Sequence, residues 1–196
     1  MTSREKILSA LSGGAGTGPV PDYRAESVSF PELVEKFREV LVSIGGAVVP
    51  MSSSAGIREY IYQHFDPRER VVSTVWPEAE QIAGAGYLHP MDNVEVAVIR
   101  AHFGVAENGA VWITDEQMVD RVVPFICQHL IVLLDKHSIV STMHDAYERI
   151  DGTDYEFGTF IAGPSKTADI EQALVLGAHG PKTMTVFLMQ NNSGDS

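Results

Sequence analysis

The sequence predicts an α/β protein, in which helices flank a central, mostly parallel β-sheet. The first observation behind this fold is alternation, because segments with the spacing of amphipathic helices are followed by short strand-like segments along the chain. The second is that several strand segments are apolar throughout, such as 130–134 and 160–162, which is typical of parallel strands covered on both faces. With 196 residues, the chain is long enough for one domain with a substantial core.

Two regions are expected along the chain. Residues 1–21 predict a small N-terminal helix and a flexible linker, because Thr2–Glu5 fits a capping box and residues 13–21 are rich in glycine and end in proline. Residues 22–196 are expected to form a single α/β domain.

The first long helix of this domain is expected from Pro31 to Ile44. Proline is favoured at the first helical position, apolar residues then keep helical spacing, and Gly45–Gly46 ends the segment. The elements expected next are a strand at 47–49, a helix at 57–65, and strands at 71–75, 94–99 and 110–113. The loop between the last two strands contains His102 and Glu107.

The second half continues the alternation. The elements expected there are a helical segment at 117–123, a strand at 130–134 and a helix from Asp135 to Ile150. The last third is interpreted as a parallel βαβ unit, with a strand at 160–162, a helix that begins near Thr167 and ends at Gly177, and a strand at 184–189. Such a unit places the loop after its first strand at the carboxyl edge of the sheet, where open α/β sheets bind ligands.

That loop, Gly163–Thr167, is the strongest candidate for a ligand site. Ser165 and Thr167 supply hydroxyl groups, Lys166 supplies an ammonium group, and Asp169 suits the positive end of the predicted helix. Together with the free N–H groups of a helix start, these residues favour a phosphate or carboxylate ligand. The alternative is an ordinary strand-to-helix turn, in which serine and threonine only cap the helix.

Composition excludes several classes of function. The formal net charge of −12 argues against nucleic acid or an anionic membrane surface as the main partner. The single cysteine, Cys127, excludes a cysteine-bound cluster within this chain and is interpreted as a small core residue. No pair of histidines has the spacing of a metal site, so no metal is expected. Without a signal peptide or an apolar membrane span, the expected location is cytoplasmic.

Two motifs give the chain a family resemblance. The stretch AGPSKTADIEQALVLGAHGPKTMTVFL, at 162–188, resembles the C-terminal signature of the LUD family, whose best-known member acts in lactate utilization. The stretch GVAENGAVWIT, at 104–114, is similar to the central motif of that family, with Asn108 and Ala110 where threonine is commoner. Three later residues continue the pattern: Arg121, Pro124 and His129.

The resemblance covers the C-terminal half of the chain closely. It implies the fold of ribose-phosphate isomerases, glucosamine-phosphate deaminases and coenzyme A transferases. It further implies a subunit that supports oxidation of L-lactate to pyruvate together with iron–sulfur partner proteins. The clusters are then expected in those partners, and no cofactor is expected in this chain.

Glu107 lies in the run Ala-Glu-Asn-Gly-Ala, and Glu-Asn-Gly is also similar to the motif that carries the catalytic glutamate of coenzyme A transferases. That carboxylate attacks an acyl thioester. Glu107 is therefore a candidate nucleophile, a ligand-positioning carboxylate, or an exposed turn residue, since Asn-Gly is a common turn dipeptide. The rival functions are a free-standing enzyme using Glu107 on an acyl or sugar-phosphate substrate, and a regulatory module that binds a small anion.

Two further residues are candidates for ligand binding. Arg121 is placed to face an anion, but acidic residues at 115, 116 and 120 precede it, so a surface ion pair is the simpler interpretation. His179 lies in the loop before Gly180–Pro181, where a hydrogen bond to nearby backbone is the alternative to a ligand contact.

Overall fold

The computed structural model describes residues 2–4, 6, 29–66, 68–76, 93–168, 174–176 and 180–190. Its centre is a sheet formed by β1 (Ala47–Met51), β2 (Val71–Ser73), β3 (Val96–Arg100), β6 (His129–Asp135) and β10 (Thr183–Met189). These five strands are all parallel, in the order β1-β10-β6-β3-β2, which confirms the predicted parallel centre. The helix and linker expected at 1–21 lie almost entirely outside the described residues.

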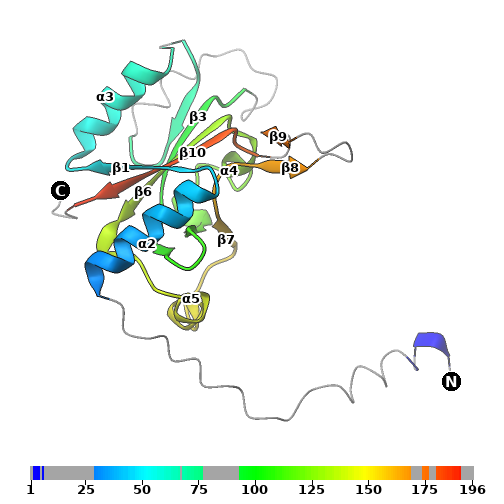
Figure 1. The fold of residues 1–196 in the computed structure, drawn as a ribbon. Coiled ribbons are helices and arrows are strands. Elements are labelled where there is room, and N and C mark those ends of the chain that lie inside the picture. The colour runs from blue at the N-terminus through cyan, green and yellow to red at the C-terminus, as the bar shows by residue number, and fades with distance from the viewer. Residues whose placement is uncertain are drawn as a thin grey trace.

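Successive residues of each central strand face two different layers, as the period of two along a strand requires. On one face, Val98 and Ile131 pack in a cluster with Ile57 and Ile61 of α3 (Ser54–His64). The helix expected at 57–65 is therefore confirmed, and its apolar face covers this side of the sheet (Figure 1).

The opposite face of the sheet is covered in part by α2 (Phe30–Ser43). The carboxylate of Glu32 accepts a hydrogen bond of 3.2 Å from the backbone N–H of Ser29 and so caps the start of the helix. Phe37 and Leu41 are fully buried in the core cluster of this face. The helix expected from Pro31 is thus confirmed, and its spacing correctly identifies the buried side chains.

A second, three-stranded antiparallel sheet completes this layer. It contains β4 (Phe103–Val105), β5 (Ala110–Thr114) and β7 (Gly158–Ile161), in the order β4-β5-β7. Val111 and Ile113 of β5 join the core against the parallel sheet, whereas Trp112 and Phe103 pack on the outer side with α5 (Met143–Ile150). The layers therefore follow the sequence α3, parallel sheet, α2 with the small sheet, and α5 (Figure 1).

The closing βαβ unit is the main error of the sequence prediction. The strand near Phe160 pairs antiparallel with β5, outside the parallel sheet. Where a helix was expected, β8 (Lys166–Ala168) pairs antiparallel with β9 (Leu174–Leu176). In this register the backbone of Thr167 lies opposite that of Val175, so strand pairing keeps this segment extended. Residues 169–173 and 177–179 lie outside the described part of the chain.

Two other helix predictions differ from the structure, one in position and one in length. Instead of a helix at 117–123, the chain forms the 3-10 turn η2 (Asp115–Gln117) and the short α4 (Val123–Ile126). The helix expected from Asp135 ends after η3 (Lys136–Ser138) and resumes only as α5. Between them, Val140 donates to the carbonyl of Gly104 and accepts from Ala106. Pairing of Val140 with the small sheet therefore keeps this segment extended and interrupts the helix.

A pocket beside the small sheet

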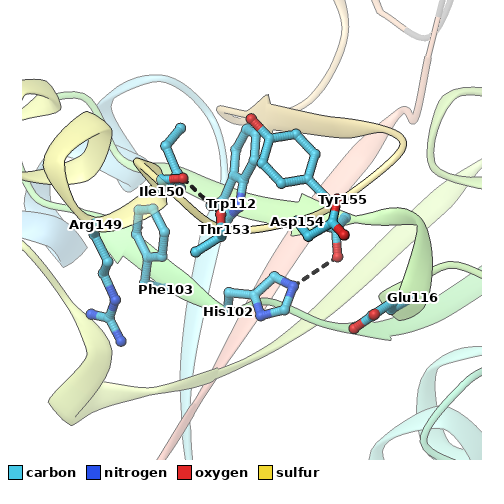
Figure 2. Close-up of a pocket in the computed structure, with 10 residues that line it drawn as sticks. His102, Phe103, Trp112, Glu116, Arg149, Ile150, Thr153, Asp154 and Tyr155 are labelled. Carbon is cyan, nitrogen blue, oxygen red and sulfur yellow. Dashed lines mark hydrogen bonds between the residues drawn. The ribbon is translucent and has the colours of Figure 1, made fainter.

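A pocket with a volume of about 190 Å³ lies beyond the carboxyl end of β3. It is lined by His102, Phe103, Trp112, Thr114, Glu116, Arg149, Ile150, Thr153, Asp154 and Tyr155 (Figure 2). These residues come from the start of β4 and the residue before it, from β5 and η2, and from the last turn of α5 with the loop that follows it. This is the side of an open parallel sheet on which ligands usually bind.

His102 lines this pocket and lies between Arg149 and Glu116 in Figure 2. Its Nε2 atom lies 2.8 Å from Oγ1 of Thr114, and its backbone N–H donates to the carbonyl of Trp112. Partial burial of the ring lowers the pKa of His102, the carboxylate of Glu116 raises it, and the charge of Arg149 lowers it. Because the net shift is downward from 6.5, the imidazole is mainly neutral at pH 7.

Arg149 brings the positive charge of the pocket. Its Nη1 atom donates to the carbonyl of Ser138 at 3.1 Å, and its guanidinium carbon lies 5.0 Å from the centroid of the Phe103 ring. Both contacts hold the guanidinium group without neutralising it. Within the described part of the chain, Arg149 forms no salt bridge.

The remaining wall is aromatic and rigid. The Trp112 ring is 4.6 Å from the Phe160 ring and 5.4 Å from the Tyr155 ring, measured between centroids. Gly158 lets the indole approach closely, because a Cβ atom at this position would lie 2.5 Å from the edge of the indole ring. Trp112 is therefore 6% exposed and fixed in position, so the pocket has a preformed apolar surface.

Glu107 lies elsewhere, in the exposed turn between β4 and β5. Its Oε2 atom accepts a hydrogen bond of 2.7 Å from the backbone N–H of Met143, the first residue of α5. Its own backbone N–H donates to the carbonyl of Ser141. The carboxylate thus satisfies a free N–H group at the start of a helix and suits the positive helix end. This arrangement gives Glu107 a structural role, and its candidate role as a nucleophile stays a prediction.

The loop that begins at Gly163 lies at the amino edge of the parallel sheet and not at the predicted carboxyl edge. Ser165 donates its backbone N–H to the carbonyl of Pro181, just before β10 begins. The Lys166 side chain ends beside Gly45, just before β1, since a Cβ atom there would lie 3.0 Å from its Nζ atom. The prediction failed because β7 belongs to the antiparallel sheet, so its end does not mark the carboxyl edge.

Both family motifs nevertheless meet at the C-terminal end of α2. Gly163 is buried with a φ of +73°, and a Cβ atom there would lie 3.1 Å from the Ile44 side chain. A Cβ atom at Gly109 would likewise lie 3.0 Å from the backbone of Leu41. The ammonium group of Lys166 complements the negative end of α2, whose last turn contains no basic residue.

The other predicted residues have separate positions. Arg121 forms ion pairs with Asp115 at 3.0 Å and with Glu156 at 2.5 Å, as the simpler interpretation expected. Asp169 and His179 lie outside the described residues, and only the backbone of Thr167 is described. Cys127 is fully buried, and this burial raises its pKa to about 12, which confirms a core residue.

Sequence reasoning missed most of the pocket. The sequence places His102 in a loop between two strands, two residues after the end of an apolar strand, and that position is a usable signal for a ligand site. Arg149 and Tyr155 had no such signal. Their approach to His102 depends on α5 folding back over the small sheet, and no local pattern predicts that packing.

Neither a metal-binding cluster nor a membrane-spanning helix is found among the described residues. No cluster of three histidine, cysteine or acidic side chains in the described ranges has the arrangement of a metal site. Among the helices formed by those residues, none is long and apolar enough to cross a membrane.

The fold and the pocket define an α/β protein with a preformed cavity beside a parallel sheet. The chain belongs to the LUD domain family, whose sequence profile matches residues 89–189, just over half of the chain. Lactate utilization protein C of Geobacillus sp. (strain WCH70) is 28% identical, over 95% of this chain and 79% of the relative. The protein of the same name from Anoxybacillus flavithermus is 26% identical, over 81% of this chain and 70% of the relative.

A solved structure supports the same fold. The crystal structure of a DUF162 family protein from Deinococcus radiodurans aligns with a TM-score of 0.57 and 16% sequence identity. The alignment covers 84% of this chain and 100% of that protein. At this level of identity the likeness concerns the fold alone.

Proposed function

We propose that this chain is a lactate-utilization subunit that supports oxidation of L-lactate to pyruvate together with iron–sulfur partner proteins. The relatives named lactate utilization protein C support this proposal, because they align along most of both chains. The membership of the LUD domain family supports it independently.

The cysteine content is the observation that supports a need for partner proteins to accept the electrons. Conversion of lactate to pyruvate removes two electrons and two protons from the substrate, and the electrons need an acceptor. A cysteine-bound cluster usually requires about four thiolates, whereas this chain has one cysteine, which is buried and has a pKa raised to about 12. Clusters that accept these electrons therefore belong to other proteins.

Growth of the native host tests this proposal. Deletion of the coding sequence should prevent growth on L-lactate, and growth on pyruvate is the matched control because pyruvate enters after the oxidation step. The full chain, carried on a plasmid with an affinity tag, should restore growth. The tagged chain, purified from cells grown on lactate, should retain proteins that contain iron and acid-labile sulfide.

Two results would overturn the proposal. Undiminished growth of the deletion strain on L-lactate would remove the role in lactate utilization. Oxidation of L-lactate by the purified chain alone, with an artificial electron acceptor, would contradict the need for partner proteins.

The rival function, a free-standing enzyme with Glu107 as nucleophile, meets a structural obstacle. The carboxylate already accepts the N–H of Met143, so attack on a thioester would require it to leave the start of α5. Glu107 is also separate from the residues that line the pocket at His102. These observations favour the subunit over the free-standing enzyme.

A further inference from the structure

We propose that the pocket between His102 and Arg149 binds a small 2-hydroxy monocarboxylate, with the carboxylate of the ligand on the guanidinium of Arg149. This inference rests on the proposed function for the class of ligand, and it names the place in this chain where that ligand binds. Neither family motif predicts it, because Arg149 lies outside both.

The first step of the argument is the charge of Arg149. Three other arginines, Arg38, Arg68 and Arg121, each pair with a carboxylate. Arg149 differs from them, since in the described ranges its partners are a carbonyl and an aromatic ring. In a chain with 26 acidic and 14 basic residues, a guanidinium that forms no ion pair within the described ranges can receive an anion from outside.

The second step is preorganisation. The hydrogen bond to Ser138 and the contact with Phe103 fix the guanidinium at the pocket wall before a ligand arrives. Phe103 is itself only 2% exposed, so the ring cannot move aside. A cation fixed in this way loses little conformational entropy when it binds a carboxylate. Its planar group can then donate two parallel hydrogen bonds.

The third step concerns the groups opposite Arg149. His102 lies between Arg149 and Glu116 (Figure 2), and both charges act on its imidazole. The carboxylates of Glu116 and Asp154 are hydrogen-bond acceptors for a hydroxyl group, whereas Nε2 of His102 already contacts Thr114 at 2.8 Å and Gln117 at 3.4 Å. The two carboxylates also repel a second negative charge. The pocket therefore matches a ligand with one carboxylate and one neighbouring hydroxyl, and it disfavours dicarboxylates and phosphates.

The fourth step is size. The volume of about 190 Å³ corresponds to about six water molecules at about 30 Å³ each. It is smaller than the pockets of about 300–1,000 Å³ that hold drug-sized ligands. The pocket thus suits a metabolite as small as lactate, with Trp112 against its apolar part.

Calorimetric titration of the purified full chain tests the proposal with four probes. L-Lactate should bind. Lactamide lacks the charge of L-lactate, propionate lacks its hydroxyl, and L-malate adds a second carboxylate. Each of these three probes should bind at least about tenfold more weakly than L-lactate. This is the effect expected when one charge-assisted hydrogen bond is lost or one charge repulsion is gained. Equal affinity for L-lactate and lactamide would overturn the assignment of the carboxylate to Arg149.

Variants locate the site. Arg149→Gln should weaken L-lactate binding by about 10- to 100-fold, the scale of a charge-assisted pair. Arg38→Gln removes the same charge from an exposed ion pair on α2 and should leave binding unchanged. Thr153→Trp keeps Arg149 and fills the pocket from an exposed position, so it should also abolish binding. Normal binding by folded Arg149→Gln or Thr153→Trp would overturn the proposal.

The failure of this proposal is distinct from failure of the proposed function. If the host needs the chain for growth on L-lactate but the pocket variants bind L-lactate normally, the subunit role stands and the pocket assignment is wrong. If L-lactate binds as described but the deletion strain grows normally on it, the site stands and the role in lactate utilization is wrong.

Discussion

Replacement of Glu107 separates a structural carboxylate from a catalytic one. Glu107→Ala removes the acceptor of the 2.7 Å hydrogen bond from Met143, together with the negative charge at the start of α5. Loss of a side-chain cap costs about 0.5–2 kcal/mol of unfolding free energy. Since about 1 kcal/mol shifts Tm by about 2–4 °C in a protein of this size, the expected decrease in Tm is about 1–8 °C.

Glu107→Gln is the sharper variant, because the amide oxygen still accepts the hydrogen bond and only the charge is lost. The interaction of that charge with the helix end contributes about 0.3–1 kcal/mol, so Tm should fall by at most about 4 °C. Glu148→Gln is the matched control, since it makes the same change at an exposed position of the same helix. Its Tm should stay within about 2 °C of wild type.

Thermal unfolding and growth on L-lactate are measured for all three variants. A structural role predicts that growth follows the amount of folded protein, so Glu107→Gln should still support growth at a temperature well below its Tm. Loss of growth with an unchanged Tm, seen for Glu107→Gln and absent for Glu148→Gln, would refute the structural role and support action on a ligand.

Three further experiments test other parts of the molecule. If the loop at Lys166 binds phosphate or a carboxylate, as the sequence predicts, Lys166→Met should weaken phosphate binding by about 10- to 100-fold in calorimetry with little change in Tm; equal binding by both proteins would contradict this. His102 should titrate in NMR below 6.5, and because the unfolded chain then takes up the proton first, stability should decrease as pH falls below 6.5. A midpoint above that value would contradict the burial argument. Cys127 should react with a thiol reagent at neutral pH only after unfolding, because burial raises its pKa to about 12; rapid labelling of the native protein would show an accessible thiol.

The parallel sheet could be predicted from sequence because a strand that is buried on both faces is apolar at every position. The segment at 130–134 is apolar throughout, and it became β6 at the middle of the sheet. The strand at Phe160 also contains a short apolar segment, yet it pairs with β5 in the antiparallel sheet. Apolar composition reports that a strand is buried, whereas the choice of its neighbour depends on residues far away in the chain.

The candidate site shows the same limit. The turn at Glu107 was predicted, but the partner of its carboxylate is Met143, 36 residues later, and local spacing cannot identify that partner. The loop at Gly163 was predicted, and its φ of +73° is a left-handed conformation that favours glycine. Its position at the amino edge depended on strand pairing, so the predicted neighbourhood of Lys166 was wrong even though the turn was correct.

The two walls of the pocket belong to different segments. His102 lies in the short link between β3 and β4, whereas Arg149 belongs to α5, which packs on the outer side of the small sheet. A ligand that contacts both side chains therefore links the outermost helix to the rest of the protein. Occupancy of the pocket should slow hydrogen exchange at the amides of α5. A protein that binds to this outer helix would then contact a surface whose stability depends on the ligand.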